Sequence, residues 1–470
     1  MSEDIQILKC RDDRAPVLLL RSETHEDESE PFKLKDGCEC SWLKKDVTIG
    51  PAKLRPRIEP WLTALFQSEH LSLLIGSGLT YAVHHIATNK DMPGMKTVEF
   101  RDFDEEINAE AKRSAQAAGR GEDCNIEDQI RVANELLRGL EIVASSFDEF
   151  EDKALHLKND LKNVLDHFAA SILKSETELI TADQERLKTA FNYLVNFLMS
   201  FASRAGTRDR LQIFTTNYDR YIEEGAELAG LHLLDRFVGS LTPIFRSSRL
   251  EVDMHYNPPG IRGEPRYLEG VARFTKLHGS LDWVNDPTQN IIRRIGLPFG
   301  AESIDPYLNA PGLKGADALK LMIYPNSAKD RETASYPYVD LFRDFAAAIC
   351  RPNNTLISFG YSFGDDHINR VIEDMLTIPS THLVVISYDD QSKRIMKMYE
   401  SLGRPAQITL LIGSHLGNFQ TLVENYLPKT AIDRTTLRMA ELLKSRGLAG
   451  QTEANEEQAP DPRKQEGDEV

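Results

Sequence analysis

The stretch that decides the fold is HLSLLIGSGLT, residues 70–80. Its first half is a short, nearly continuous apolar run, which is typical of a strand buried on both faces of a parallel sheet. A glycine turn, Gly76-Ser77-Gly78, follows, and the residues after it predict a helix. The stretch therefore predicts a strand, a tight turn and a helix, which together are the first half of a βα unit.

Further apolar runs predict the rest of the sheet, and segments with helical spacing separate most of them. The runs are LQIFTTNYD (211–219), RFTKLHGSLDW (273–283), LKLMIYPNS (319–327), NTLISFGYSFGDDHIN (354–369), HLVVISYDD (382–390) and QITLLIGSH (407–415). Strands that alternate with helices indicate a parallel sheet covered on both faces. We therefore expect an α/β fold: a parallel sheet with helices on both faces, plus an inserted helical subdomain.

The segments outside this pattern predict the domain organisation. No proline occurs between Pro93 and Pro243, and most of this interval has helical spacing, which predicts a helical insertion. The first residues are polar with short apolar runs, and we expect an arm that packs on another subunit or on the body. The predicted parts are an N-terminal arm (1–55), the α/β domain (56–100 and 205–425), the helical insertion (101–204), a C-terminal helix (426–449) and a disordered acidic tail (450–470).

Composition excludes several function classes. The chain has 470 residues and a net charge of -17, which disfavours broad binding to nucleic acid because that affinity comes from Lys and Arg on phosphates. No apolar stretch is long enough for a membrane helix, and no export signal begins the sequence, so we expect a cytoplasmic protein. The five cysteines are an odd, scattered set, which predicts free thiols and no structural metal.

Four polar clusters follow predicted strands. In an open α/β sheet, ligands bind beyond the carboxyl ends of the strands, so we expect all four clusters to meet at one rim. The clusters are Gly76-Ser77-Gly78-Leu79-Thr80, Thr215-Thr216-Asn217-Tyr218-Asp219, His278-Gly279-Ser280 and residues 360–367, GYSFGDDH.

Each cluster has both a functional and a purely structural interpretation. The glycine turn either lets backbone amides and a helix N-terminus hold a phosphate or only relieves strain, and no P-loop motif occurs in the chain. Asn217 and Asp219 either hold a water or a ribose hydroxyl or cap the next helix.

The histidines and the last cluster also have two interpretations. A lone histidine is more often structural, which is how we interpret His84, His85, His367 and His415. His278 differs because Gly279 removes bulk at the rim and Asn217 should lie on a nearby strand. In the last cluster Gly360 and Ser362 suit a second phosphate or ribose contact, whereas Asp365, Asp366 and Asn369 suit helix capping.

In this order, the four clusters resemble the SIR2-like NAD-consuming family, most closely the bacterial SIR2 domains that act in antiphage defence. The resemblance covers about residues 56–100 and 205–425. It implies a Rossmann-like domain that binds NAD between a glycine-rich loop and a ring of strand ends, with NAD as the substrate and without a metal.

The resemblance also implies roles for individual residues. Asn217 and Asp219 would hold the nicotinamide ribose and the attacking water, and His278 would contact the ribose hydroxyl as a base. The remaining residues would bind other parts of NAD: Gly76, Ser77, Gly78 and Thr80 the pyrophosphate and ribose, Gly360 and Ser362 the other side of the cofactor, and Ser387 to Asp389 the adenosine ribose.

One departure from the family changes the expected activity. Protein deacylases of this family carry a zinc module with two CxxC pairs after the histidine-glycine motif, and this chain has no cysteine between Cys124 and Cys350. The implied activity is therefore hydrolysis of NAD to nicotinamide and ADP-ribose.

Other functions and partners stay open. The alternatives are a deacylase or ADP-ribosyltransferase on the same scaffold, and a non-catalytic subunit that senses NAD or ADP-ribose and controls a partner. The helical insertion and the arm motivate the hypothesis of a large homo-oligomer, and the resemblance further implies a HerA-like ATPase as a partner.

Overall fold

A computed structural model describes most of the chain. The described residues are 4–21, 31–45, 47–92, 96–117, 124–204, 208–248, 253–256, 266–286, 291–309, 313, 336–390 and 392–429. All but the last two of them belong to one compact unit, Met1–Leu427.

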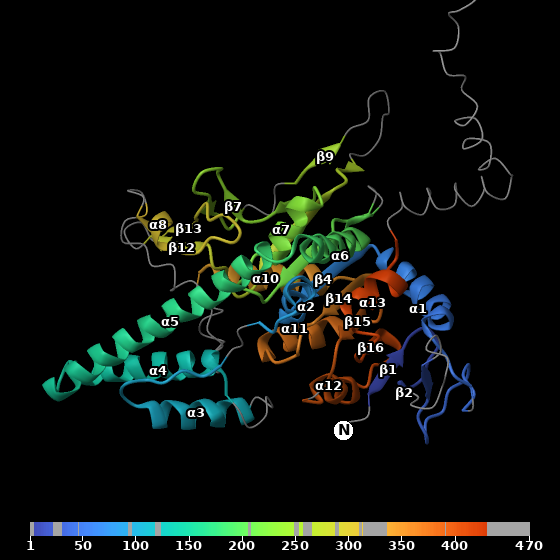
Figure 1. Cartoon of the computed structure of the whole chain (residues 1–470), viewed down its shortest axis with the longest axis horizontal. Helices are drawn as coiled ribbons and strands as arrows, with labels where there is room; N and C mark the ends of the chain where they lie inside the picture. The colour runs from blue at the N-terminus through green and yellow to red at the C-terminus, as the bar shows by residue number, and fades with distance from the viewer. Residues whose placement is uncertain are drawn as a thin grey trace, which may run out of the picture. The chain divides into compact units, whose positions relative to one another are not determined.

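A ten-stranded sheet forms the centre of this unit (Figure 1). Its strand order is β3-β2-β1-β16-β15-β14-β4-β5-β11-β6, and all neighbours from β16 to β6 are parallel. The strands are β1 (Ile5–Lys9), β2 (Val17–Arg21), β3 (Phe32–Leu34), β4 (His70–Ile75), β5 (Gln212–Thr215), β6 (His232–Leu234), β11 (Val271–Lys276), β14 (Asn354–Phe359), β15 (His382–Ser387) and β16 (Ile408–Ile412).

The strand order confirms the Rossmann-like prediction. From β4 the chain proceeds outward to β5 and β11 on one side, and later to β14, β15 and β16 on the other. This is the doubly wound order 3-2-1-4-5-6, in which the order reverses between strands 1 and 4 and ligands bind at that switch point. Here the switch point lies between β4 and β14.

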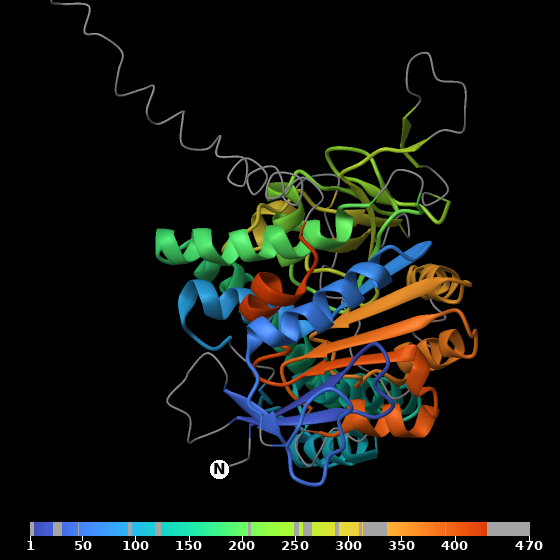
Figure 2. The same ribbon diagram turned by 90° about the vertical axis from the view of Figure 1, so that its right-hand side faces the viewer.

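Helices cover both faces of the sheet (Figures 1 and 2). Strand residues alternate between two apolar cores: Leu73 and Ile75 pack with α1, α2, α6 and α7, whereas Leu74 and Leu356 pack with α10 and α11. The helices are α1 (Pro51–Phe66), α2 (Ser77–Thr88), α3 (Asp104–Ala117), α4 (Ile126–Ala144), α5 (Glu151–Ile180), α6 (Gln184–Ala202), α7 (Tyr221–Leu228), α8 (Asp305–Leu308), α10 (Tyr338–Ile349), α11 (Asp366–Leu376), α12 (Arg394–Leu402) and α13 (Phe419–Thr421).

The first residues extend the sheet, so β1, β2 and β3 of the predicted arm (1–55) pack on the body, which is one of the two positions expected for it. β1 pairs antiparallel with β16, and β2 and β3 continue outward from it. Leu8 and Leu19 are fully buried, so the short apolar runs bury one face and cover the edge that β16 would otherwise expose. The predicted boundary at residue 56 also falls inside α1, which begins at Pro51 because proline suits the first helical position.

Most of the described residues between 101 and 204 are helical, and the helices pack in two places. Helices α3, α4 and α5 share a core of their own with Tyr218, a residue of the TTNYD cluster. Helix α6 instead contributes Phe197 and Phe201 to the core on one face of the sheet. The helical segment therefore contacts both the sheet and the end of β5.

A smaller sheet, which the sequence analysis did not predict, is built from strands on both sides of the histidine-glycine motif in the sequence. Its order is β12-β13-β8-β7, and a separate pair joins β9 to β10. These strands are β7 (Phe237–Val238), β8 (Ile244–Phe245), β9 (His255–Tyr256), β10 (Arg266–Tyr267), β12 (Trp283–Asp286) and β13 (Ile291–Arg294).

Several predictions concern segments beyond the described residues. The strand at 319–327 and the acidic tail at 450–470 lie there, as does all of the C-terminal helix except its first four residues. Among the described helices, none combines the length and apolarity that crossing a membrane requires.

Candidate active site

Four neighbouring strands end at the same level. The residues aligned across them are Phe359 of β14, Ile75 of β4, Thr215 of β5 and Lys276 of β11. The chain therefore leaves all four strands side by side. The structure brings the four predicted clusters to one rim. Ser77, Asn217 and His278 each lie two residues after the last residue of the strand that precedes them.

The two glycine turns touch each other at the switch point. The amide of Gly76 donates to the carbonyl of Phe359 at 3.0 Å, and the amide of Gly78 donates to the carbonyl of Gly360 at 3.0 Å. A Cβ on Gly76 would lie 2.4 Å from the Gly360 carbonyl oxygen, and Gly360 has a φ of +60°. Close packing between the turns therefore requires glycine at these positions, whether or not a phosphate binds.

The exposed part of the turns still suits an anion. Ser77 and Ser362 are exposed, and Ser77 is the first residue of the twelve-residue helix α2. The partial positive charge of a helix N-terminus at a strand end favours a phosphate group.

A hydrogen-bonded network, defined here as Asn217, Thr80 and Asp219, joins the ends of β4 and β5. The Asn217 side-chain amide donates to the Gly76 carbonyl at 3.0 Å and to the Thr80 hydroxyl at 2.9 Å. The Thr80 hydroxyl in turn donates to Asp219 Oδ2 at 2.8 Å. Both amide hydrogens of the buried Asn217 are thus committed, which fixes its orientation and makes Oδ1 the atom that would accept a hydrogen bond from a ligand or water.

Asp219 is held from its other side by β11 and α7. Its Oδ1 accepts from the Tyr221 amide at 3.2 Å, so it also contributes to capping the next helix. Lys276 donates to the Asp219 carbonyl and pairs with Glu223 at 2.9 Å. Burial raises the pKa of the Asp219 carboxyl, and the charge of Lys276 and the Thr80 hydrogen bond oppose this shift.

A buried ion pair, which the sequence did not reveal, anchors the residue after Asp219. Glu176 of α5 is fully buried and accepts from the amide of Arg220 at 3.0 Å and from its guanidinium. The same guanidinium donates to the carbonyls of Leu297 and Pro298. The end of β5 is therefore tied to the long helix α5.

His278 lies beside His367, a histidine that the sequence analysis interpreted as structural. Its Nε2 lies 3.4 Å from Nε2 of His367, with the ring centroids 5.5 Å apart. His278 is buried, and His367 is half-buried in the first turn of α11. The sequence signal for His367 was its position directly after Asp365 and Asp366 at a strand end, but these residues also suit helix capping.

Comparison with known families gives a match over the segment that contains three of the four clusters at this rim. Residues 211–404 match the family model of the SIR2-like domain. The matched segment contains Asn217, Asp219, His278 and Gly360, and it begins after the GSG turn. None of the curated proteins compared with the chain matches it. A SIR2-like domain indicates an NAD-dependent activity in general.

Ser387 and Asp389 lie one strand farther along the SIR2-like domain. β15 is in register with β14, so Ser387 leaves the sheet beside Gly360. The Ser387 hydroxyl donates to the Asp389 carbonyl at 2.7 Å, and the Asp389 side chain is exposed. The carboxylate that accepts from amides in the first turn of α12, those of Ile395 and Met396, is instead Asp390. The predicted contact of Ser387 and Asp389 with the adenosine ribose stays a prediction.

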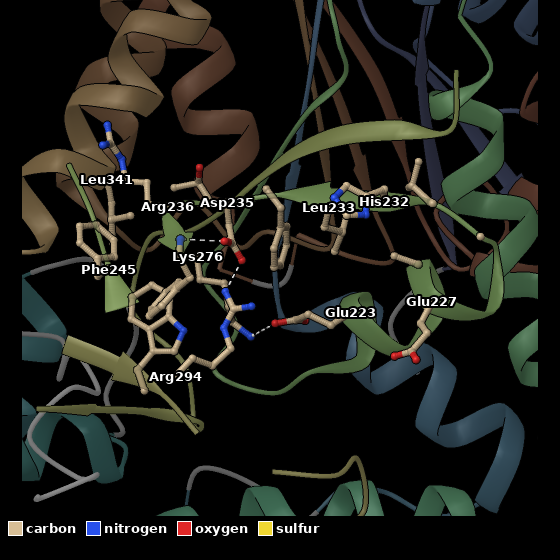
Figure 3. Close-up of a pocket in the computed structure, with 17 residues that line it drawn as sticks. Glu223, Glu227, His232, Leu233, Asp235, Arg236, Phe245, Lys276, Arg294 and Leu341 are labelled. Carbon is tan, nitrogen blue, oxygen red and sulfur yellow. Dashed lines mark hydrogen bonds and ion pairs between the residues drawn. The ribbon is translucent and has the colours of Figure 1, made fainter. Parts of the chain in front are cut away.

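A cavity of about 390 Å³ is lined by residues of β6 and β11 at the edge of the sheet. Figure 3 shows the Glu223 carboxylate directed at Lys276 and the Asp235 carboxylate directed at Arg294, two ion pairs within the cavity wall. Trp283 and other aromatic rings line it as well, and none of the predicted site residues is among its described lining residues. Lys276 is the link to the rim, since it also holds the Asp219 carbonyl.

The described residues contain no group of three or more His, Cys, Asp or Glu side chains placed to hold a metal ion.

Proposed function

We propose that the protein hydrolyses NAD to nicotinamide and ADP-ribose at the rim formed by β14, β4, β5 and β11. The observation that carries the proposal is the fixed amide of Asn217 at the end of β5, beside His278 at the end of β11. The SIR2-like domain supplies the general dependence on NAD, and the missing CxxC pairs favour water over an acyl-lysine acceptor.

The chemistry needs orientation more than strong acids. Cleavage of the bond between ribose and nicotinamide passes through an oxocarbenium-like state, as at other glycosidic bonds. Asn217 Oδ1 would accept a hydrogen bond from the attacking water or a ribose hydroxyl, and His278 would take a proton as the general base. The N-terminus of α2 would offer its positive end to the pyrophosphate.

The test is incubation of the purified full chain with NAD, with nicotinamide and ADP-ribose separated by chromatography. We expect Asn217→Ala and His278→Ala each to lower the rate about 10²- to 10⁴-fold, the usual range for a general base or a positioning group. His85→Ala is the matched control, because His85 is exposed on α2 and should change the rate little. Wild-type rates in both site variants would refute the assignment.

The alternatives predict different products. A deacylase would release acetyl-ADP-ribose from an acylated peptide, and a transferase would label a protein with ADP-ribose. A sensing subunit would bind NAD or ADP-ribose in a calorimeter without turnover, both alone and with its partner.

We further propose that the chain forms a homo-oligomer and works with a HerA-like ATPase in antiphage defence. The resemblance of the motifs supports this, and so do three apolar side chains around the turn between α4 and α5 that are more than half exposed, Ile142, Phe147 and Leu155. A monomeric mass in solution, together with no binding to candidate ATPases, would contradict it.

A further inference from the structure

The two histidines at the rim come from strands that are not neighbours. His278 follows β11 and His367 follows β14, and β4 and β5 lie between these strands in the sheet. Their Nε2 atoms are nevertheless 3.4 Å apart. This is slightly longer than a good hydrogen bond, and contacts of catalytic groups commonly tighten when substrate binds.

The two rings differ in their access to solvent. The residue exposure of His278 is 6%, whereas His367 is half-buried, with Phe342 of α10 packed edge-on against it at 4.7 Å between ring centroids. A proton held on His278 therefore has a second imidazole as its neighbour on the way to water.

The reaction of the proposed function produces such a proton. NAD carries a positive charge on the nicotinamide ring, and hydrolysis by one water yields neutral nicotinamide, ADP-ribose and one proton. The electron pair of the broken bond between C1′ and nitrogen goes to nicotinamide, and the water oxygen forms the new bond to C1′. The base that takes the proton must release it before the next turnover.

We propose that His367 relays this proton. Neutral His278 takes the proton released by the attacking water, and the resulting imidazolium donates from Nε2 to Nε2 of His367. His367 then loses a proton to solvent, which returns both rings to the neutral state. His367 is thus a proton-relay and positioning residue that acts through His278, and the inference rests on the proposed function.

The experiment measures kcat and KM for NAD on the full chain, with EDTA present so that a metal ion bridging the two rings cannot contribute. His367→Phe keeps an aromatic ring beside Phe342 but carries no proton, and His367→Ala opens space for a small base. We expect kcat to fall about 10²-fold in both variants, at the low end of general acid–base effects, with KM nearly unchanged. His85→Ala again is the matched control.

Free imidazole separates relay from packing. In His367→Ala, added imidazole should restore much of kcat, whereas choline chloride at equal ionic strength should not. A wild-type kcat in His367→Phe, or a loss in His367→Ala that imidazole leaves unchanged, would overturn the relay while hydrolysis by the wild type stands. Absence of nicotinamide release by the wild type would instead overturn the proposed function, and the relay with it.

Discussion

The two sides of the rim are built from different parts of the chain. At the switch point between β4 and β14, backbone meets backbone: Gly76 and Gly78 touch Gly360, and a Cβ at any of the three would lie less than 3 Å from the other turn. At the ends of β5 and β11, side chains meet side chains, through Asn217 and Lys276. The contact between the β4 and β14 turns, called here the glycine side, therefore determines how closely the turns approach. The ends of β5 and β11, called here the side-chain side, supply the groups that could react.

This difference changes how the glycine motif is interpreted. Its glycines are needed even without a ligand, so the GSG turn by itself is weak evidence for a phosphate. Asn217 is stronger evidence for a ligand site. Two hydrogen bonds fix its buried side-chain amide at the strand end, beyond which a ligand would lie.

The largest expected effect is on the glycine side. Gly360→Ala places a methyl group against Gly78 in a left-handed conformation, and strain plus overpacking should lower the free energy of unfolding by roughly 3–5 kcal/mol. Gly37→Ala is the matched control, because Gly37 also has a positive φ but has open space around it, so it should cost only about 1 kcal/mol. The measurement is the free energy of unfolding of both variants in urea. Equal losses of unfolding free energy would show that the contact between the turns contributes nothing to stability.

The next effect tests how the side-chain side is anchored. Glu176→Gln leaves the guanidinium of Arg220 buried without its counter-charge, and should lower the free energy of unfolding by about 3 kcal/mol. The same urea titration should show less than about 0.5 kcal/mol for Glu185→Gln, an exposed site on α6. If both variants unfold alike, α5 does not anchor the end of β5.

The sequence predicted the rim because the rim follows from local signals. Each of β4, β5, β11 and β14 is a short apolar run that ends in polar residues or glycine, and parallel strands place such ends together. The candidate residues Asn217 and His278 were therefore identifiable from the sequence.

The partners of these residues were not predictable in the same way. Glu176 and Arg220 are 44 residues apart, and His278 and His367 are 89 apart, so only the folded chain brings them together. The N-terminal strands were missed for a related reason: a short apolar run such as Val17–Arg21 does not reveal which sheet edge it will cover.

A smaller effect should separate stability from function on the side-chain side. Thr80→Val keeps the shape of Thr80 but leaves Asn217 and Asp219 each without one hydrogen bond, at a cost of about 2 kcal/mol. Nicotinamide release should fall at least about tenfold, because the Asn217 amide is then held by only one bond. Thr88→Val, where the hydroxyl bonds only the His84 carbonyl and the Lys90 amide at the C-terminal end of α2, should preserve the rate. A wild-type rate in Thr80→Val would mean that the network does not orient Asn217.

The smallest effect comes from a histidine far from the rim, which shows what a structural histidine does. His382 begins β15 and contacts the Thr409 hydroxyl at 2.8 Å. Burial, with a smaller effect from the charge of Lys9, lowers its pKa to about 4. The folded state favours the neutral ring, so its contribution to stability is complete above the unfolded pKa of about 6.5 and is lost as pH falls towards 4.

His382→Gln should therefore cost about 1 kcal/mol at pH 7. Because protonating the buried ring costs the wild type more than this, the difference in unfolding free energy should shrink and then change sign as pH falls from about 6.5 towards 4. His415, whose pKa burial also lowers to about 4, is present in both proteins and cancels in the difference. Nicotinamide release at pH 7 should be unchanged, in contrast to His278→Ala. A difference in stability that does not vary with pH would show that His382 is not held neutral by the fold, and a loss of activity would remove the distinction between it and the histidines of the rim.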